Sequence, residues 1–323
     1  MPYTPPFTIT AKIVNLVAEI SAKLERLSIE RETADSVRLR KVNRMRTIRG
    51  SLAIEGNSLS EEQVTALLDG KHVVAPVKEV QEVRNAILAY ERFSELDPYK
   101  CEDLLTAHGI MALGLVDNPG HFRQGGVCVA GKDGISHIAP PAERVPVLIS
   151  DLFDWLKSAD DHMLIKSSVF HYEFEFIHPF ADGNGRMGRF WQSRLLADWN
   201  PAFANLPVEN MIWEHQAEYY KAIEQSTDAT DSGIFVEFML TTILESIKKH
   251  SSDNVAKVTV KVTVNQEKLL QAIRAQPYIT QSELAAIVGI SLKSVKENMK
   301  KLQERGLLRR VGADKNGYWE IIE

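Results

Sequence analysis

Hydrophobic residues recur at helical spacing through most of the first 250 residues of this 323-residue chain. The clearest run returns to an apolar side chain every three to four positions, at Ile13, Leu16, Val17, Ile20, Leu24 and Leu27. A basic, helix-prone stretch covers 38–49, and Gly50 and Gly56 then bracket a short segment, 51–55. Ser60-Glu-Glu-Gln has the form of a capping box at a helix start. Further helices are predicted over 60–68, 80–96, 101–113, 145–156, 162–177 and 189–199.

One internal segment breaks the helical pattern. Residues 122–138 read as two short strands around a Gly-Lys-Asp-Gly turn at 131–134, which predicts a β-hairpin. The proline pair at 140–141 ends it. The first 250 residues are therefore expected to form a mainly α fold that carries one hairpin.

The pattern of hydrophobic and polar residues changes beyond residue 250. Polar residues at 250–254 predict a linker, and 258–264 alternates as a strand does. Residues 265–323 then resemble a winged helix-turn-helix domain. The segments that carry this resemblance are three helices and a two-stranded wing, at 269–273, 280–289, 291–305 and 306–322.

Composition narrows the class of protein. Hydrophobic residues make up 44% and charged residues 25% of the chain, as in ordinary globular proteins. No apolar run approaches the roughly 20 residues of a membrane span, and the N-terminus lacks the features of a signal peptide. With only Cys101 and Cys128, neither a disulfide framework nor a thiolate zinc site is supported. A cytoplasmic location without membrane contact is the expectation.

The net charge of −5 hides an uneven distribution. Residues 291–310 carry seven basic side chains against two acidic ones, and the basic ones are Lys293, Lys296, Lys300, Lys301, Arg305, Arg309 and Arg310. A basic third helix with a basic wing is typical of DNA binding. Winged helices also serve as protein-interaction or dimerisation modules. The sequence therefore leaves open whether 291–310 binds DNA and whether the chain forms a homodimer.

The densest chemistry lies at 178–189, which reads His-Pro-Phe-Ala-Asp-Gly-Asn-Gly-Arg-Met-Gly-Arg. His178 is a candidate proton acceptor because its ordinary pKa lies near neutrality. Asp182 is a candidate Mg²⁺ ligand. The turn Gly183-Asn184-Gly185 precedes a predicted helix, so its backbone N–H groups and the helix dipole favour an anion. A guanidinium, such as that of Arg186 or Arg189, can bind a phosphate group through two parallel hydrogen bonds. The segment indicates work on a nucleotide polyphosphate.

This segment resembles the signature of the Fic family, His-Pro-Phe-x-Asp/Glu-Gly-Asn-Gly-Arg-x-x-Arg, at every fixed position. The resemblance covers about residues 1–245 and implies a Fic-type helical core with the hairpin as a flap over the active site. It also implies transfer of AMP from ATP, with Mg²⁺, to a Ser, Thr or Tyr hydroxyl of a target protein. The target's backbone would lie along the flap as an added strand. The expected domains are an N-terminal helical region (1–100), the catalytic core (101–250) and the winged helix domain (265–323).

A second segment, Ser51-Leu-Ala-Ile-Glu55-Gly56, resembles the family's inhibitory motif. The resemblance implies that Glu55 reaches the nucleotide site and pairs with Arg189. A carboxylate there competes with the γ-phosphate for the guanidinium and repels ATP. Ser51 and Glu55 are therefore the expected inhibitory residues.

Other functions stay open at this stage. Some family members with the inhibitory Glu remove AMP instead, and a DNA-binding regulator with a ligand-sensing core is a different class. A zinc site built from His171, His178 and Asp182 is disfavoured because the chain holds no His-Glu-x-x-His spacing.

Overall fold

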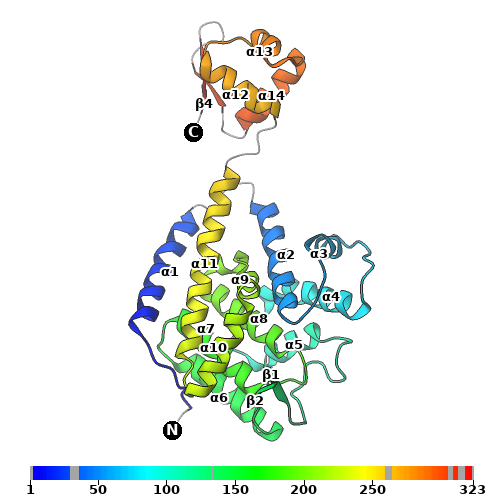
Figure 1. Cartoon of the computed structure of the whole chain (residues 1–323), viewed down its shortest axis with the longest axis vertical. Helices are drawn as coiled ribbons and strands as arrows, with labels where there is room; N and C mark the ends of the chain where they lie inside the picture. The colour runs from blue at the N-terminus through cyan, green and yellow to red at the C-terminus, as the bar shows by residue number, and fades with distance from the viewer. Residues whose placement is uncertain are drawn as a thin grey trace. The chain divides into compact units, whose positions relative to one another are not determined.

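The computed structural model describes residues 3–29, 36–131, 134–258, 264–304, 308–311 and 317–321. They group into two compact units, Met1–Ser251 and Ser252–Glu323 (Figure 1). The predicted mainly α fold with a hairpin and a winged helix-turn-helix is confirmed. Among the described residues, no helix is long and apolar enough to cross a membrane.

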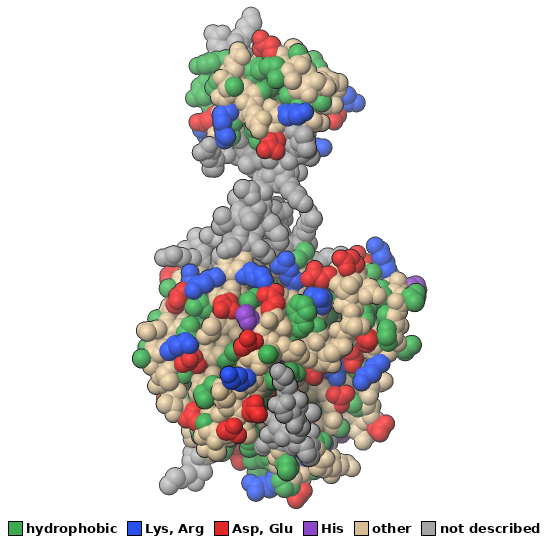
Figure 2. All heavy atoms as spheres, viewed as in Figure 1, with side chains coloured by type: hydrophobic (Ala, Val, Ile, Leu, Met, Phe, Trp, Pro, Cys, Tyr) green, Lys and Arg blue, Asp and Glu red, His purple; other side chains and the backbone are tan. Residues whose placement is uncertain are grey.

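The first unit begins with five helices and a short 3₁₀ turn. Their bounds are α1 Ala11–Ile29, α2 Ser36–Ile54, α3 Glu61–Leu68, α4 Val77–Glu91, η1 Phe93–Glu95 and α5 Cys101–Met111. Ser60 caps α3 with the predicted capping box. Figure 2 shows positive and negative side chains interspersed over the visible face of this unit.

The prediction that Gly50 breaks the second helix is wrong, because α2 continues through it to Ile54. A Cβ on Gly50 would lie 2.6 Å from the Cα of Asn210 in α9 (Val208–Glu214). Glycine at this position therefore allows α2 and α9 to pack closely. It lowers the stability of the helix by about 1 kcal/mol relative to alanine, and the close contact offsets this loss. Residues 51–54 are the last turn of α2 rather than a separate segment.

The rest of the first unit surrounds a central pair of helices. Its elements are η2 Ala142–Arg144, α6 Val145–Ser158, α7 Met163–Ile177, α8 Asn184–Trp199, η3 Pro201–Asn205, α9, α10 Gln216–Ala229 and α11 Gly233–Val258. Helix α7 is buried on nearly every side and packs against α8, as expected for a helix at the centre of a core. Helix α1 lies along α11, and the ion pairs Lys12–Glu237 and Glu19–Lys248 join them (Figure 1).

The linker predicted at 250–254 is wrong, because α11 runs through these residues to Val258. A helix that is already nucleated gains one hydrogen bond with each added residue, so a few polar residues do not stop it. Of the predicted strand at 258–264, residues 259–263 lie outside the described residues, and Val258 and Val264 are helix ends.

The predicted hairpin is present with shorter strands. Strand β1 (Cys128–Gly131) pairs antiparallel with β2 (Gly134–Ile138), and Gly131 lies opposite Gly134. A register shift follows Val129. Residues 122–127 are not strands, because they approach the core as a loop that is described below.

The second unit has its own hydrophobic core. Its elements are α12 Val264–Ala275, α13 Gln281–Val288, α14 Leu292–Glu304, β3 Leu308–Val311 and β4 Tyr318–Ile321. The fully buried members of the core are Leu269, Ile273, Ile279, Leu284, Val295, Met299 and Leu302. Thr280 caps α13 through a capping box, and Gly289 ends it with a left-handed φ of 73°. The two antiparallel strands form the predicted wing.

Candidate active site

The signature loop starts where α7 ends. His178 follows Ile177 in a left-handed conformation (φ 50°, ψ 61°), and its N–H still donates to the carbonyl of Phe174 at 2.9 Å. The following Pro179 disfavours helical backbone at His178. A left-handed non-glycine residue costs of order 1–3 kcal/mol, and such strain concentrates at functional sites. The His178 side chain is 20% exposed.

Asn184 closes the loop with its side chain. Its Oδ1 accepts the N–H of Phe180 at 2.8 Å, and its Nδ2 donates to the carbonyl of Phe180 at 2.9 Å. The amide is therefore used within the protein, and only the backbone N–H of Asn184 remains for a ligand at the start of α8. Gly183 precedes it with a φ of 85°, a conformation that favours glycine.

His108 packs against the signature loop. The sequence did not identify it as a site residue. Its ring stacks on the buried Phe180 with centroids 3.7 Å apart. Nδ1 accepts the N–H of Gly120 at 2.9 Å, so Nε2 carries the proton and donates to the carbonyl of Asp182 at 3.1 Å. Burial lowers the pKa of His108 to about 4, which keeps this ring neutral at physiological pH.

Arg123 is a second residue that sequence reasoning missed. Its guanidinium is buried and joins the two stems of the hairpin to the signature loop. It donates to the carbonyls of His178 (2.7 Å), Gly125 (2.8 Å), Pro140 (2.5 Å) and Ile177 (3.3 Å). Because all these acceptors are backbone carbonyls, no motif of side chains marks this arginine.

The N-terminus of α8 combines a carboxylate with a buried cation. Asp182 Oδ1 accepts the N–H of Gly183 at 2.6 Å and lies 3.6 Å from Arg186 Nη2, while the Asp182 side chain is 50% exposed. The Arg186 side chain is only 5% exposed, and its Nε and Nη1 have no hydrogen-bond partner among the described residues. Each unpaired buried donor costs about 1–3 kcal/mol. Such a guanidinium is ready to receive an anion.

Arg189 is completely buried and already paired. Its Nη2 donates to Glu55 Oε1 at 2.7 Å and to the carbonyl of Ser51 at 3.0 Å, and its Nε donates to Ser51 Oγ at 3.2 Å. Glu55 Oε1 lies 2.3 Å from the position that a Cβ on Gly185 would take. The glutamate carboxylate therefore lies against the first turn of α8, where a bound anion would be favoured.

The end of α2 is fixed in this position by α10. The carbonyl of Ile54 accepts from Gln216 Nε2 at 2.7 Å and from the Tyr220 hydroxyl at 3.4 Å. Asn57 Nδ2 donates to Glu82 Oε2 at 2.9 Å on α4. These contacts hold Glu55 at Arg189 from both sides.

The structure does not support the zinc alternative. His171 is fully buried and its ring nitrogens contact Gln192 Oε1 (2.6 Å) and the Tyr219 hydroxyl (3.1 Å). Within the described ranges, no group of three or more His, Cys, Asp or Glu side chains could hold a metal ion. One exposed carboxylate, Asp182, does fit Mg²⁺ when phosphate oxygens and water supply the other ligands.

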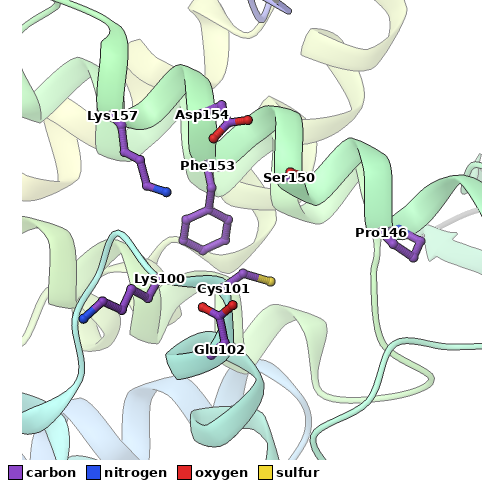
Figure 3. A pocket seen from close by; sticks show the side chains of 8 residues that line it. All are labelled: Lys100, Cys101, Glu102, Pro146, Ser150, Phe153, Asp154 and Lys157. Carbon is purple, nitrogen blue, oxygen red and sulfur yellow. The ribbon is translucent and has the colours of Figure 1, made fainter.

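An open cleft of about 270 Å³ lies apart from the signature, between α6 and the start of α5 (Figure 3). Its charged lining residues are Lys100, Glu102, Asp154 and Lys157. The two signs balance, and Lys100 is already paired with Asp97 at 3.0 Å. Burial raises the pKa of the Cys101 thiol in the same cleft, which keeps it protonated. None of the predicted site residues lies there.

Comparison with known proteins agrees with this geometry. The Fic/DOC family pattern matches residues 95–196, and a winged helix-turn-helix DNA-binding pattern matches 264–309. A protein named protein adenylyltransferase Fic from Culex quinquefasciatus is 29% identical over 252 residues, which are 71% of this chain and 47% of that protein. A probable protein adenylyltransferase from Aquifex aeolicus is 25% identical over 58% of this chain and 57% of its own length. The chain thus spans about half the length of the curated relatives it matches.

A solved structure covers nearly the whole chain. The crystal structure of a Fic family protein from Desulfovibrio desulfuricans superposes with a TM-score of 0.76 and 41% sequence identity, over 99% of this chain and 98% of that one. This likeness extends through both units, and the signature loop lies inside the matched family region. The chain therefore belongs to the Fic family and carries a C-terminal winged helix-turn-helix.

Proposed function

We propose that the protein transfers AMP from ATP to a Ser, Thr or Tyr hydroxyl of a target protein. The observation that carries this is the buried Arg186, whose Nε and Nη1 lack partners among the described residues, at the helix terminus that follows His178. The names of the Culex and Aquifex relatives support the same reaction. An anion site next to a general base is what nucleotidyl transfer requires.

The reaction assigns one task to each signature residue. His178 takes the proton of the incoming hydroxyl, whose oxygen bonds to the α-phosphorus of ATP. The bond from that phosphorus to the β-phosphate oxygen breaks, and pyrophosphate leaves. Arg186 and the backbone N–H groups of residues 183–185 bind the phosphates. Arg189 is the partner of the γ-phosphate.

Asp182 is the residue that would hold Mg²⁺. Its carboxylate is half exposed, and Oδ2 has no hydrogen-bond partner among the described residues, which leaves an oxygen for a hard cation. The ion would neutralise charge on the phosphates. His108 positions this residue through the carbonyl of Asp182.

Autoinhibition by Glu55 is the second part of the proposal. The Glu55 carboxylate takes the Arg189 Nη2 donor at 2.7 Å, and Ser51 takes Nε and shares Nη2. The γ-phosphate of ATP needs the same donors and would meet a like charge. ATP then binds in an unproductive position until α2 moves.

The hairpin supplies the target surface. Strands β1 and β2 form a two-stranded sheet, and Ile138 at the end of β2 is exposed. An extended peptide can add to such an edge through backbone hydrogen bonds. Arg123 ties the base of this hairpin to the carbonyl of His178, so a peptide on the hairpin is held near the base.

Incubation with lysate and ATP labelled at either the α- or the γ-phosphate tests the proposal. The α-label should arrive on protein and the γ-label should leave as pyrophosphate. Protein labelled from the γ-phosphate would instead mean phosphoryl transfer and would reject AMP transfer. The lysate experiment run with Arg186→Ala is the matched control, and it should lose the α-label.

Removal of AMP is a second candidate reaction, and the exposure of Glu55 favours it. The Glu55 side chain is 38% exposed although its Oε1 is bound to Arg189. A carboxylate with solvent access next to a phosphate site can orient a hydrolytic water. Incubation with an AMP-modified protein distinguishes the two reactions, because only removal releases free AMP without ATP.

DNA binding is a proposal for the second unit alone. The matched winged helix pattern supports it, as do the lysines on α14 at 293, 296, 300 and 301. In the wing, Glu320 offsets the charge of Arg309, whereas Arg310 stacks on Trp319 and keeps its charge. Arg305 lies outside the described residues. The helix rather than the wing is therefore the proposed DNA-contacting element.

A further inference from the structure

A buried carboxylate lies directly behind the proposed base. Glu175 precedes His178 by three residues on the last turn of α7, and its side chain is 10% exposed. Its Oε2 is 4.0 Å from His178 Nδ1. Its Oε1 is buried without a hydrogen-bond partner among the described residues, 3.7 Å from His171 Nε2. Burial of an ionised carboxylate is costly unless cations surround it, so this glutamate calls for an explanation.

The surroundings keep the carboxylate ionised. Burial by itself would raise the pKa of Glu175, but the interactions with His171, His178 and Arg189 outweigh it and lower that pKa below its usual value. At 3.7 Å the contact with His171 is an ion-pair distance rather than a hydrogen bond. A negative charge therefore lies 4.0 Å from His178 Nδ1.

A hydrogen-bond network fixes the His171 ring beside Glu175. Gln192 Nε2 donates to Ser168 Oγ at 3.2 Å, so Gln192 Oε1 accepts from His171 Nδ1 at 2.6 Å. The Tyr219 hydroxyl contacts His171 Nε2 at 3.1 Å on the side that faces Glu175. The ring of His171 has no freedom to turn away.

Helix α8 closes the remaining side of the carboxylate. A Cβ on Gly188 would lie 2.8 Å from Glu175 Oε1 and 2.8 Å from His171 Cδ2. Gly188 occupies one of the two positions that the family signature leaves free, between the two arginines. Its small size is what lets a glutamate fit at 175.

The tautomer of His178 follows from its acceptors. Two groups lie near Nδ1, the carbonyl of Glu175 at 3.3 Å and its carboxylate at 4.0 Å, and both are acceptors only. Nδ1 must therefore carry the proton in the neutral ring, which leaves the lone pair on Nε2. A base that acts through Nε2 becomes an imidazolium, which a buried negative charge behind it stabilises, as in a catalytic triad.

We propose that Glu175 is a positioning residue for the transfer reaction: its backbone carbonyl, 3.3 Å from Nδ1, sets the His178 tautomer, and its buried carboxylate, 4.0 Å from Nδ1, stabilises the imidazolium that forms. The inference rests on the proposed function for its kinetic consequences, but not for the tautomer itself. The titratable and charged groups that face Glu175 are His171 and His178 from α7 and its cap, Arg189 from α8, and Tyr219 and Tyr220 from α10.

The kinetic test compares variants in the Glu55→Gly background. Glu175→Gln keeps size and removes charge, and it should lower kcat roughly 10- to 100-fold with KM for ATP unchanged. The acidic limb of its pH–rate profile should move to lower pH by roughly one unit, because the protonated ring loses a stabilising charge. Glu175→Asp should recover most of the rate. Glu173→Gln is the matched control, because Glu173 is also buried on α7 but bonds Tyr3 at 2.6 Å instead.

A spectroscopic test does not depend on catalysis. In the ¹⁵N spectrum of the histidine rings at about pH 8, above the ordinary pKa of histidine, His178 should show a protonated Nδ1 and an unprotonated Nε2. Glu175→Ala should keep that tautomer, because the backbone carbonyl remains, and unchanged dispersion of the other resonances confirms the fold. An Nε2-protonated ring in the unaltered protein, or a Glu175→Gln variant with unchanged kcat and pH profile, overturns the inference. If no variant transfers AMP, the proposed function fails and the spectrum alone decides the tautomer.

Discussion

Replacement of Glu55 by glycine should increase activity, which is opposite to what most substitutions do. In the structure the Glu55 carboxylate occupies the Nη2 donor of Arg189 at 2.7 Å and lies against Gly185 at the start of α8. Removal of the carboxylate leaves the Arg189 guanidinium free to bind the γ-phosphate of ATP. The carbonyl and hydroxyl of Ser51 still hold Arg189 in place, so the phosphate site should keep its shape.

The magnitude follows from the geometry of this pair. A hydrogen bond to a charged group contributes about 1.5–3 kcal/mol. Because the Glu55 side chain is 38% exposed, solvent screening reduces this to about 1–2 kcal/mol. That corresponds to a gain of roughly 5- to 30-fold in productive ATP binding.

Self-labelling with α-labelled ATP is the assay, since it needs no knowledge of the target. The gain should require Arg189, so Glu55→Gly combined with Arg189→Ala should be no faster than Arg189→Ala alone. Glu91→Gly is the control, because Glu91 is likewise an exposed glutamate at the end of a helix, α4. A folded Glu55→Gly protein that labels no faster than the unaltered one would refute the inhibitory role.

Three further predictions concern the signature loop and its support, and one concerns the second unit. His178→Ala should lose AMP transfer but keep ATP binding, as measured by calorimetry, because the phosphate ligands are other residues; retained transfer would remove it as the base. Asp182→Asn should slow transfer steeply and recover in part at high Mg²⁺, and indifference to both substitution and chelator would exclude it as a ligand. Alanine at both Lys296 and Lys300 should weaken binding to mixed genomic DNA and flatten its salt dependence, whereas an unaltered protein without salt-sensitive binding would point to a protein partner. The lowered pKa of His108, about 4 against an ordinary 6.5, means that only the unfolded chain takes up a proton between these values. The free energy of unfolding should therefore drop by about 3 kcal/mol as pH falls through this window, and His108→Phe should lose that dependence in urea denaturation.

The local elements could be predicted from the sequence because interactions between residues close together in the chain produce each of them. The predicted capping box at Ser60 is satisfied within a few residues and is present. The predicted helix at 280–289 likewise has local ends, a capping box at Thr280 and a left-handed Gly289. The signature segment is equally local, since α8 starts inside it at Asn184. The contact between Glu55 and Arg189 was expected only from the family resemblance, because 134 residues separate them.

What the sequence did not predict depends on long-range contacts. In the sequence Gly50 indicates a helix break, whereas in the structure it lies within α2 because the backbone of Asn210 packs against it. Arg123 and His108 act on backbone carbonyls and N–H groups far along the chain, and such partners leave no pattern of side chains. The sequence did not identify Glu175 as a site residue. Glutamates alternate with aromatic residues on α7, and this pattern does not indicate that the helix is buried on nearly every side.

The most direct test of AMP transfer is the intact mass of the Glu55→Gly protein after incubation with ATP and Mg²⁺. We expect an added AMP on a Ser, Thr or Tyr hydroxyl, with one pyrophosphate released for each modified residue. The same protein with His178→Ala should gain no mass. An added phosphate in place of AMP, or an adduct that forms equally well without His178, would contradict this expectation.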